Sequence, residues 1–202
     1  MTIEFEETRA VRLHTVIVSV QHTTALESTR RPGGAFLVGR PRRDAGLTGR
    51  KNVVDTHGGF ARQRGGALSG KDPSHVDRFG AYVARNVVAA GLARRCEIQL
   101  SYDIGEEQPL AVTVETFGTG TVPDERIEQA PHEVFDLRPV AVAETLGLRT
   151  LPAQRGGEFY RTLAAYGQIG RVDLDAPWER EDQTAAVRWS GARAEQRNVM
   201  NM

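Results

Sequence analysis

The chain has 202 residues, of which 40% are hydrophobic and 26% charged, so a folded globular protein is expected and wholesale disorder is excluded. No apolar run approaches the roughly 18 residues that a membrane span needs, and the acidic start Met1–Glu7 lacks the apolar core of a secretory signal. The single cysteine, Cys96, excludes an internal disulfide framework, and we therefore expect a cytoplasmic protein.

Apolar patterning predicts the elements in chain order. Alternating and β-branched residues predict strands at 2–5 and 11–20 and a short strand at 52–54. Asp72 as N-cap and Pro73 in the first turn predict a helix that ends at Gly91. The alternation then predicts a strand pair at 97–104 and 110–117.

The second half of the chain is expected to be mostly helical. A helix is predicted at 124–135, interrupted by Pro131, and another at 139–148. The tail beyond Arg180 is polar and is expected to be frayed. Tyr166 and Trp178 are aromatic residues of the type usually found in a core. The predicted fold class is α+β, a mixed β-sheet with helices packed on one face.

The net charge of zero hides an uneven distribution. Residues 30–95, called the basic segment below, contain 14 basic and 4 acidic residues, and the remainder contains 12 basic and 22 acidic residues. Only two of the 26 cations are lysines, Lys51 and Lys71, and both lie in the basic segment. Either a ligand requires compact ammonium groups there, or the two lysines are left over from compositional drift towards arginine.

Glycine-rich stretches surround both lysines. Asp44–Lys51 places a carboxylate and two cations at the ends of a turn, which is typical either of a polyanion site or of a solvated basic hairpin. Lys71, at the predicted helix start, favours an anion. Residues 65–71 match G-x-x-x-x-G-K, but Asp72 replaces the hydroxyl residue of a P-loop. Nucleic acid is an alternative ligand, but the glycine loops fit a small polyphosphate better.

Other candidate groups are less informative. Asp77 could hold Mg²⁺ against phosphates, or it could only compensate the helix dipole. The five histidines show no metal-ligand spacing, and Cys96 is expected to be structural rather than nucleophilic.

Several motifs in register resemble the methionine adenosyltransferase (S-adenosylmethionine synthetase) family. The resemblance extends from about Thr2 to about Arg188. It is carried by residues 44–51 (DAGLTGRK), 69–73 (SGKDP), 76–78 (VDR), 86–92 (NVVAAGL), 114–119 (VETFGT), 135–139 (FDLRP), 164–167 (AAYG) and 177–179 (PWE).

The resemblance implies a truncated form of the family's fold of three related α+β domains. By this reading, 39–180 is the C-terminal domain, 1–38 is a remnant of the middle domain and 181–202 is a polar tail. The implied reaction joins ATP and L-methionine to S-adenosylmethionine with release of tripolyphosphate, using Mg²⁺ and K⁺. The implied assembly is a homo-oligomer or a complex with a subunit that supplies the missing domain, with neither membrane nor nucleic acid as a partner.

Roles for individual residues follow from the resemblance by position. Phe36 corresponds to an aromatic residue packing on adenine, Asp44 to a carboxylate shared by methionine and ATP, and Asp77 to a magnesium ligand. The implied catalytic residues are Arg50, Lys51 and Lys71. The implied ATP-binding residues are Ala35, Phe36, Asp44, Arg50, Lys51, Ala67 and Lys71, and the implied methionine-binding residues are Asp44 and His75.

The chain also departs from the family pattern. The family's N-terminal domain is absent, His75 stands where a lysine is expected, and Arg40, Arg42 and Arg43 stand where glycines and a small linker are expected. Two hypotheses follow from these departures. The chain is an active transferase, alone or with the missing half-site supplied by another subunit, or it is an inactive remnant that binds nucleotide or polyphosphate.

Overall fold

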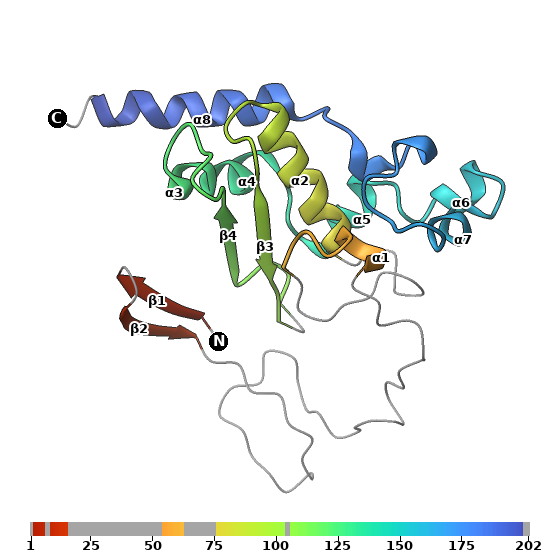
Figure 1. The fold of residues 1–202 in the computed structure, drawn as a ribbon, viewed down its shortest axis with the longest axis horizontal. Coiled ribbons are helices and arrows are strands. Elements are labelled where there is room, and N and C mark those ends of the chain that lie inside the picture. The colour runs from red at the N-terminus through yellow and green to blue at the C-terminus, as the bar shows by residue number, and fades with distance from the viewer. Residues whose placement is uncertain (1, 7–8, 16–53, 63–75, 104–105, 200–202) are drawn as a thin grey trace, which may run out of the picture.

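The computed structural model describes residues 2–6, 9–15, 54–62, 76–103 and 106–199 (Figure 1). It confirms an α+β fold. The strands are β1 (Thr2–Glu6), β2 (Arg9–Thr15), β3 (Glu97–Ser101) and β4 (Ala111–Glu115). The α-helices are α1 (Val54–His57), α2 (Asp77–Ala89), α3 (Asp124–Ile127), α4 (Gln129–Val134), α5 (Pro139–Thr145), α6 (Leu151–Gln154), α7 (Phe159–Leu163) and α8 (Thr184–Val199). Two 3₁₀ turns, η1 (Val172–Leu174) and η2 (Pro177–Glu179), complete the described elements.

The strands form two separate pairs. β1 pairs with β2, and β3 with β4, and both pairs are antiparallel. The mixed sheet predicted from sequence is therefore not found among the described residues, where each strand pairs with its neighbour in sequence. Ile98 lies opposite Val114 and Leu100 opposite Val112, so apolar side chains share one face of the β3–β4 pair. This face packs against the helices.

Helix α2 ends as the sequence predicts. Gly91 has a φ of 77°, its N–H donates to the carbonyl of Val88, and the N–H of Leu92 donates to the carbonyl of Val87. This pair of hydrogen bonds is a Schellman motif, in which glycine avoids the steric cost of a left-handed residue. The described part of the helix begins at Asp77, and the predicted N-cap Asp72 lies outside the described residues.

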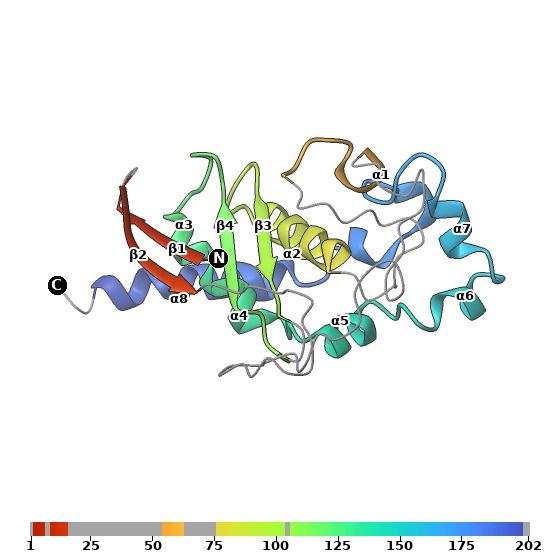
Figure 2. The ribbon, with the colours of Figure 1, turned by 90° about the horizontal axis from the view of Figure 1, so that it is seen from below.

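The core lies between α2, the β3–β4 pair and the helices that follow. Phe79, Tyr82 and Phe135 form an aromatic cluster with ring centroids 5.6–5.9 Å apart. Figure 2 shows α2 running beside β3, an arrangement that buries the apolar side of the helix. The fully buried aliphatic residues include Val83, Val87, Ile127, Val142, Leu148, Leu163 and Val187.

The predicted helix 124–135 is interrupted, as expected, but the break lies before the proline. α3 ends at Ile127 and α4 begins at Gln129, so Pro131 lies in the first turn of α4. Proline has no N–H to donate to the carbonyl of Ile127, and its ring crowds that carbonyl, so the break falls one turn upstream. α5 then begins at Pro139, where the fixed φ of proline suits the first helical position.

The prediction of a frayed tail beyond Arg180 is wrong for residues 184–199, which form helix α8. Helix α8 runs across α3, α4 and the end of α2 (Figure 1). Val187 is fully buried, Ser190 donates to Glu133 at 2.6 Å, and Arg188 Nε donates to the carbonyl of Ala90 at 3.1 Å. The interface uses few apolar side chains, which explains why apolar periodicity did not reveal it. Among the described residues, no helix is both long and apolar enough to cross a membrane.

Residues 146–180, called the C-terminal loop segment below, contain only short helices and turns. Seven of these residues have positive φ, among them Tyr166 and Asp175, which are not glycine. Trp178 is fully buried, as predicted, with its ring 6.0 Å from that of Phe159. The prediction for Tyr166 is wrong, because its side chain is 95% exposed. Arg171 Nη1 donates to the carbonyls of Ala165 and Gly167, and this holds Tyr166 on the surface.

Candidate functional site

Of the residues to which the sequence assigned a role, only Asp77 lies in the part of the chain that the structure describes. The other eight lie outside it, and their roles stay predictions. They are Ala35, Phe36, Asp44, Arg50, Lys51, Ala67, Lys71 and His75. The described framework around the basic segment consists of residues 54–62, the start of α2 and the elements that hold them.

Asp77 is the first residue of α2 and is half-buried. Its Oδ2 atom is shielded from solvent. At this position the carboxylate faces the positive end of the helix dipole, which stabilises its charge. A metal ion held there would need further oxygen ligands, because no group of three acidic, histidine or cysteine side chains able to hold a metal occurs among the described residues.

Arg78 is the next residue, and its side chain is almost fully buried. Its Nη2 donates to Gln168 Oε1 at 2.7 Å, and its guanidinium lies 5.1 Å from the ring of Trp178 and 5.8 Å from that of Tyr160. Trp178 in turn donates from Nε1 to the carbonyl of Gln168 at 2.8 Å. The C-terminal loop segment is thereby fastened to the start of α2, next to Asp77.

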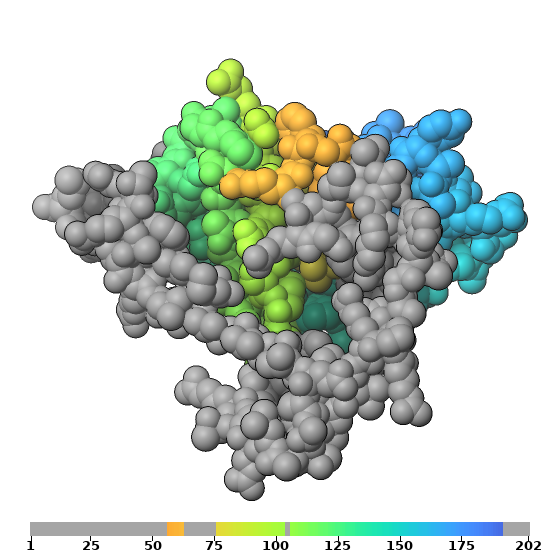
Figure 3. Space-filling view, turned by 60° about the horizontal axis from the view of Figure 1, so that its bottom comes forward, coloured from red at the N-terminus to blue at the C-terminus, as the bar shows by residue number. Residues whose placement is uncertain are grey.

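Helix α1 and the residues after it form a short surface segment, 54–62. Figure 3 shows its orange part lying against the green β3–β4 region. The predicted strand 52–54 is wrong at Val54, which begins α1, and residues 52–53 lie outside the described residues. The β propensity of Val54 is overridden by the helical turn, and Thr56 in that turn is 1% exposed.

His57, at the end of α1, interacts electrostatically with Asp77 and Glu97. Burial lowers the pKa of its imidazole below 6.5, and the two carboxylates oppose this shift without reversing it. His57 is therefore neutral at pH 7. The sequence placed no functional group here, and histidine spacing could not have revealed it, because the neighbours of His57 come from α2 and β3.

Segment 54–62 is attached to the sheet by a charged contact. The backbone N–H of Arg62 donates to Glu97 Oε2 at 2.9 Å. The Nε atom of the Arg62 side chain donates to Glu97 Oε1 at 2.5 Å. Arg62 Nη2 also lies 3.7 Å from Glu115 Oε2. No sequence pattern indicates this contact, although the predicted pairing of strands 97–104 and 110–117 places Glu97 and Glu115 at the same end.

An aromatic contact lies beside the Arg62–Glu97 ion pair. The guanidinium of Arg95 lies 3.7 Å from the ring centroid of Phe117 and 4.6 Å from that of Phe60, a geometry that favours cation–π attraction. Phe117 has a φ of 55°, which is strained for a residue with a side chain. These contacts hold Phe60 at the sheet end although 71% of its surface is exposed.

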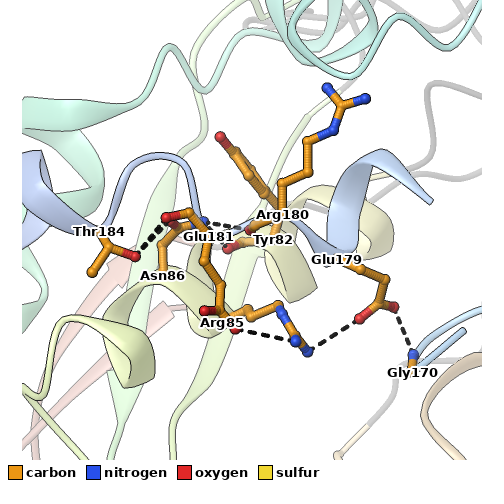
Figure 4. A network of polar contacts seen from close by, with 8 residues as sticks. All are labelled: Tyr82, Arg85, Asn86, Gly170, Glu179, Arg180, Glu181 and Thr184. Carbon is orange, nitrogen blue, oxygen red and sulfur yellow. Dashed lines mark hydrogen bonds and ion pairs between the residues drawn. The ribbon is translucent and has the colours of Figure 1, made fainter. Parts of the chain in front are cut away.

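The C-terminal half of α2 carries a polar network (Figure 4). Arg85 pairs with Glu179 at 3.2 Å and with Glu181 at 3.1 Å, and Glu179 accepts the N–H of Gly170 at 2.6 Å. Asn86 donates to the carbonyl of Arg180 and accepts the N–H of Gln183. This network fixes the chain that leads from the C-terminal loop segment into α8.

Neither the Cys96 thiol nor an open hollow on the described surface belongs to the candidate site. Burial raises the pKa of the Cys96 thiol to about 12, so it is protonated and unreactive at neutral pH, consistent with the structural role expected from sequence. An open hollow of about 360 Å³ contains none of the residues assigned a role. Its lining residues are Gln108, His132, Phe135, Asp136, Leu137 and Arg138.

Most of the chain resembles proteins of one known family. Residues 38–180 match the family described as S-adenosylmethionine synthetase, C-terminal domain. The S-adenosylmethionine synthase of Synechococcus sp. (strain JA-2-3B'a(2-13)) is 44% identical over 229 aligned positions, which cover 93% of this chain and 55% of that protein. That of Crocosphaera subtropica is 55% identical over 161 positions, which cover 78% of this chain and 39% of that protein.

A solved structure gives the same relationship. The unusual S-adenosylmethionine synthetase from Campylobacter jejuni superposes with a TM-score of 0.60 at 38% identity, over 70% of this chain and 37% of that one. This chain spans about half the length of the curated relatives it matches. The extent and identity of these matches show that the chain belongs to the S-adenosylmethionine synthetase family, of which it contains the C-terminal domain.

Proposed function

We propose that this chain takes part in forming S-adenosylmethionine from ATP and L-methionine, with release of tripolyphosphate. The observation that carries the proposal is the family match across residues 38–180, which includes Lys51 and Lys71. A chain that otherwise uses arginine keeps its two lysines at positions where the family resemblance expects polyphosphate ligands.

The chemistry requires a stabilised leaving group. Displacement of tripolyphosphate by the methionine sulfur leaves dense negative charge, which fixed cations stabilise. We assign this role to Arg50, Lys51 and Lys71. Phe36 would pack on the adenine and Asp44 would bind both substrates, while Ala35 and Ala67 would contact the nucleotide through their backbone. His75 would lie near methionine.

Asp77 fits a magnesium ligand. Mg²⁺ keeps several waters and usually takes only one or two protein carboxylates together with substrate phosphates, so a single half-buried aspartate suffices. When bound, the ion would supply charge neutralisation on the phosphates. The neutral His57 nearby adds no competing positive charge at pH 7. Among the described residues nothing identifies a K⁺ site, and K⁺ remains an implication of the family.

The length of the chain favours a second candidate function. The chain spans about half the length of its curated relatives, and we infer that part of the active site of such a protein lies in the portion that these 202 residues do not match. Turnover would then need another copy or a partner subunit to supply the missing half-site. Without one, the chain would bind nucleotide or polyphosphate and turn over no substrate.

A product assay and a separate ATP-binding titration together distinguish the two functions. The purified chain is incubated with ATP, L-methionine, Mg²⁺ and K⁺, and S-adenosylmethionine and tripolyphosphate are quantified. Both products should form, and Lys51→Ala and Lys71→Ala should abolish them, while Arg161→Ala in α7 should leave them unchanged. Lysine-dependent ATP binding without product would establish the binding function. ATP binding that is indifferent to both lysine variants, again without product, would refute the proposal and the site assignment together.

A further inference from the structure

We propose that Gln168, acting through Arg78, is a positioning residue for Asp77, the carboxylate assigned to Mg²⁺. The side chain of Gln168 fixes the buried guanidinium of Arg78, and this sets the place of the first turn of α2, to which Asp77 belongs. The inference rests on the proposed function in one respect, because it takes Asp77 as a ligand of Mg²⁺. All three residues belong to the part of the chain that the structure describes.

The first support is the burial of a charged side chain. Arg78 is only 2% exposed, and a buried guanidinium is costly unless its N–H groups and its charge meet partners. Its Nη2 donates to Gln168 Oε1 at 2.7 Å, and its guanidinium lies 5.1 Å from the ring centroid of Trp178 and 5.8 Å from that of Tyr160. Because an acceptor and two rings must be met together, these groups fix where the guanidinium lies.

The second support is that Gln168 is itself held in place. It is 2% exposed, and its backbone carbonyl accepts the Nε1–H of Trp178 at 2.8 Å. Trp178 is fully buried, with its ring 6.0 Å from that of Phe159. The acceptor for Arg78 is thus part of a packed unit within the C-terminal loop segment, and this unit places the start of α2.

The helical backbone links Arg78 to Asp77. The two residues are consecutive at the start of α2, where the N–H of Gly80 donates to the carbonyl of Val76 at 2.8 Å. Consecutive residues share a rigid peptide plane, so a shift of the first turn at Arg78 moves the Asp77 carboxylate with it. Groups that orient a metal ligand in this way typically account for about ten- to a hundredfold in metal affinity.

The test measures binding of Mn²⁺ alone to the full chain by electron paramagnetic resonance, because Mn²⁺ takes the same oxygen ligands as Mg²⁺. Gln168→Met removes the acceptor of Arg78 but keeps a side chain of similar length, and should weaken binding about tenfold. Asp77→Asn should remove this binding, and Gln168→Met should add little in that background. Gln168→Glu keeps an acceptor for Arg78 and should retain most of the wild-type affinity.

Glu179→Ala is the matched control for a merely structural role. Glu179 fastens the same C-terminal loop segment to α2 further along the helix, pairing with Arg85 at 3.2 Å and accepting the N–H of Gly170 at 2.6 Å (Figure 4). Both Glu179→Ala and Gln168→Met should lower the urea midpoint of unfolding, but only Gln168→Met should weaken Mn²⁺ binding.

Two outcomes would contradict the inference in different ways. Equal losses of Mn²⁺ affinity in Gln168→Met and Glu179→Ala, or no loss in Gln168→Met, would overturn the inference and leave the proposed function standing. Mn²⁺ binding that is indifferent to Asp77→Asn would overturn both the inference and the assignment of Asp77 to Mg²⁺. The product assay reports on the proposed reaction separately.

Discussion

The helix–sheet core, made of α2, β3, β4, α4 and α8, and the C-terminal loop segment are stabilised in different ways. The core pairs its backbone in a helix and a strand ladder and buries aliphatic side chains between them. The loop segment has only short-range backbone hydrogen bonds of turns and short helices, and arginine side chains bind some of its backbone carbonyls in addition. Arg155 donates to the carbonyls of Leu174 and Asp175, and Arg171 to those of Ala165 and Gly167.

This difference explains part of the excess of arginine. The planar guanidinium has several N–H donors in a fixed arrangement and can bind two carbonyls at once, which a lysine ammonium does less well. The arginines of the loop segment therefore have a structural use. Lys51 and Lys71 lie outside the described residues, and their ligand role stays a proposal.

The largest expected effect tests how strongly the two regions are coupled. Trp178→Ala removes a fully buried ring that contacts Arg78 of the core, and should destabilise the protein by about 3–5 kcal/mol in urea unfolding followed by circular dichroism. Trp189→Ala on α8 is the control, because Trp189 is 59% exposed and its loss should cost well under this amount. Two separate unfolding transitions in the Trp178 variant would mean that the regions fold independently.

A smaller effect is expected inside the core. Val187→Ala removes a fully buried side chain where α8 packs on the core, and should cost about 2 kcal/mol by loss of transfer free energy and formation of a cavity. Val172→Ala is the matched control, because Val172 is 70% exposed. If both variants had the same urea midpoint, α8 would not contribute to the stability of the core.

Arg171→Lys tests the loop segment directly. Lysine keeps the charge but cannot bind the carbonyls of Ala165 and Gly167 together with both Asp173 oxygens, so a loss of about 1 kcal/mol is expected. Arg161→Lys is the control, because the Arg161 side chain is 79% exposed. Equal thermal midpoints for the two variants would contradict the carbonyl-binding role.

The smallest expected effect is a pH dependence. The pKa of His57 is lower in the folded state than its ordinary value of 6.5, so the unfolded chain binds the proton more readily. The neutral His57 side chain contributes fully to the free energy of unfolding above pH 6.5. This contribution is lost as the pH falls from 6.5 towards the pKa of His57 in the folded state. Thermal midpoints between pH 7.5 and 5.5 should therefore fall less steeply in His57→Gln than in the wild type. Parallel curves would refute this.

The sequence predicted the elements whose signal is local. The β3–β4 pair follows from alternation, the end of α2 from Gly91 and the break near Pro131 from proline chemistry. The sequence did not predict α8, because up to Gly191, whose backbone lies close to the Leu92 side chain, this helix docks through Val187 and polar contacts rather than through an apolar stripe. It did not predict the exposure of Tyr166, which depends on Arg171 binding the carbonyls on either side.

The candidate site likewise contains residues that the sequence revealed and residues that it did not. The family resemblance identifies residues through motifs, but of those nine only Asp77 lies in the described framework. The residues that hold this framework in place, such as Arg62, Glu97 and Arg95, lie outside the motifs that carry the family resemblance. Their contacts join positions far apart in sequence. The predicted strand pair brings Glu97 and Glu115 to one end, but no local pattern indicates that Arg62, 35 residues before Glu97, meets them there.

Because the two tryptophans differ in burial, they act as intrinsic fluorescence probes of two regions of the protein. Trp178 is sealed in the loop segment and Trp189 is largely exposed on α8, and the chain contains only these two. Acrylamide should quench the emission of Trp189 while leaving that of Trp178 unaffected until the loop segment opens. With each tryptophan replaced in turn by phenylalanine, steady-state fluorescence would follow each region separately without any attached label.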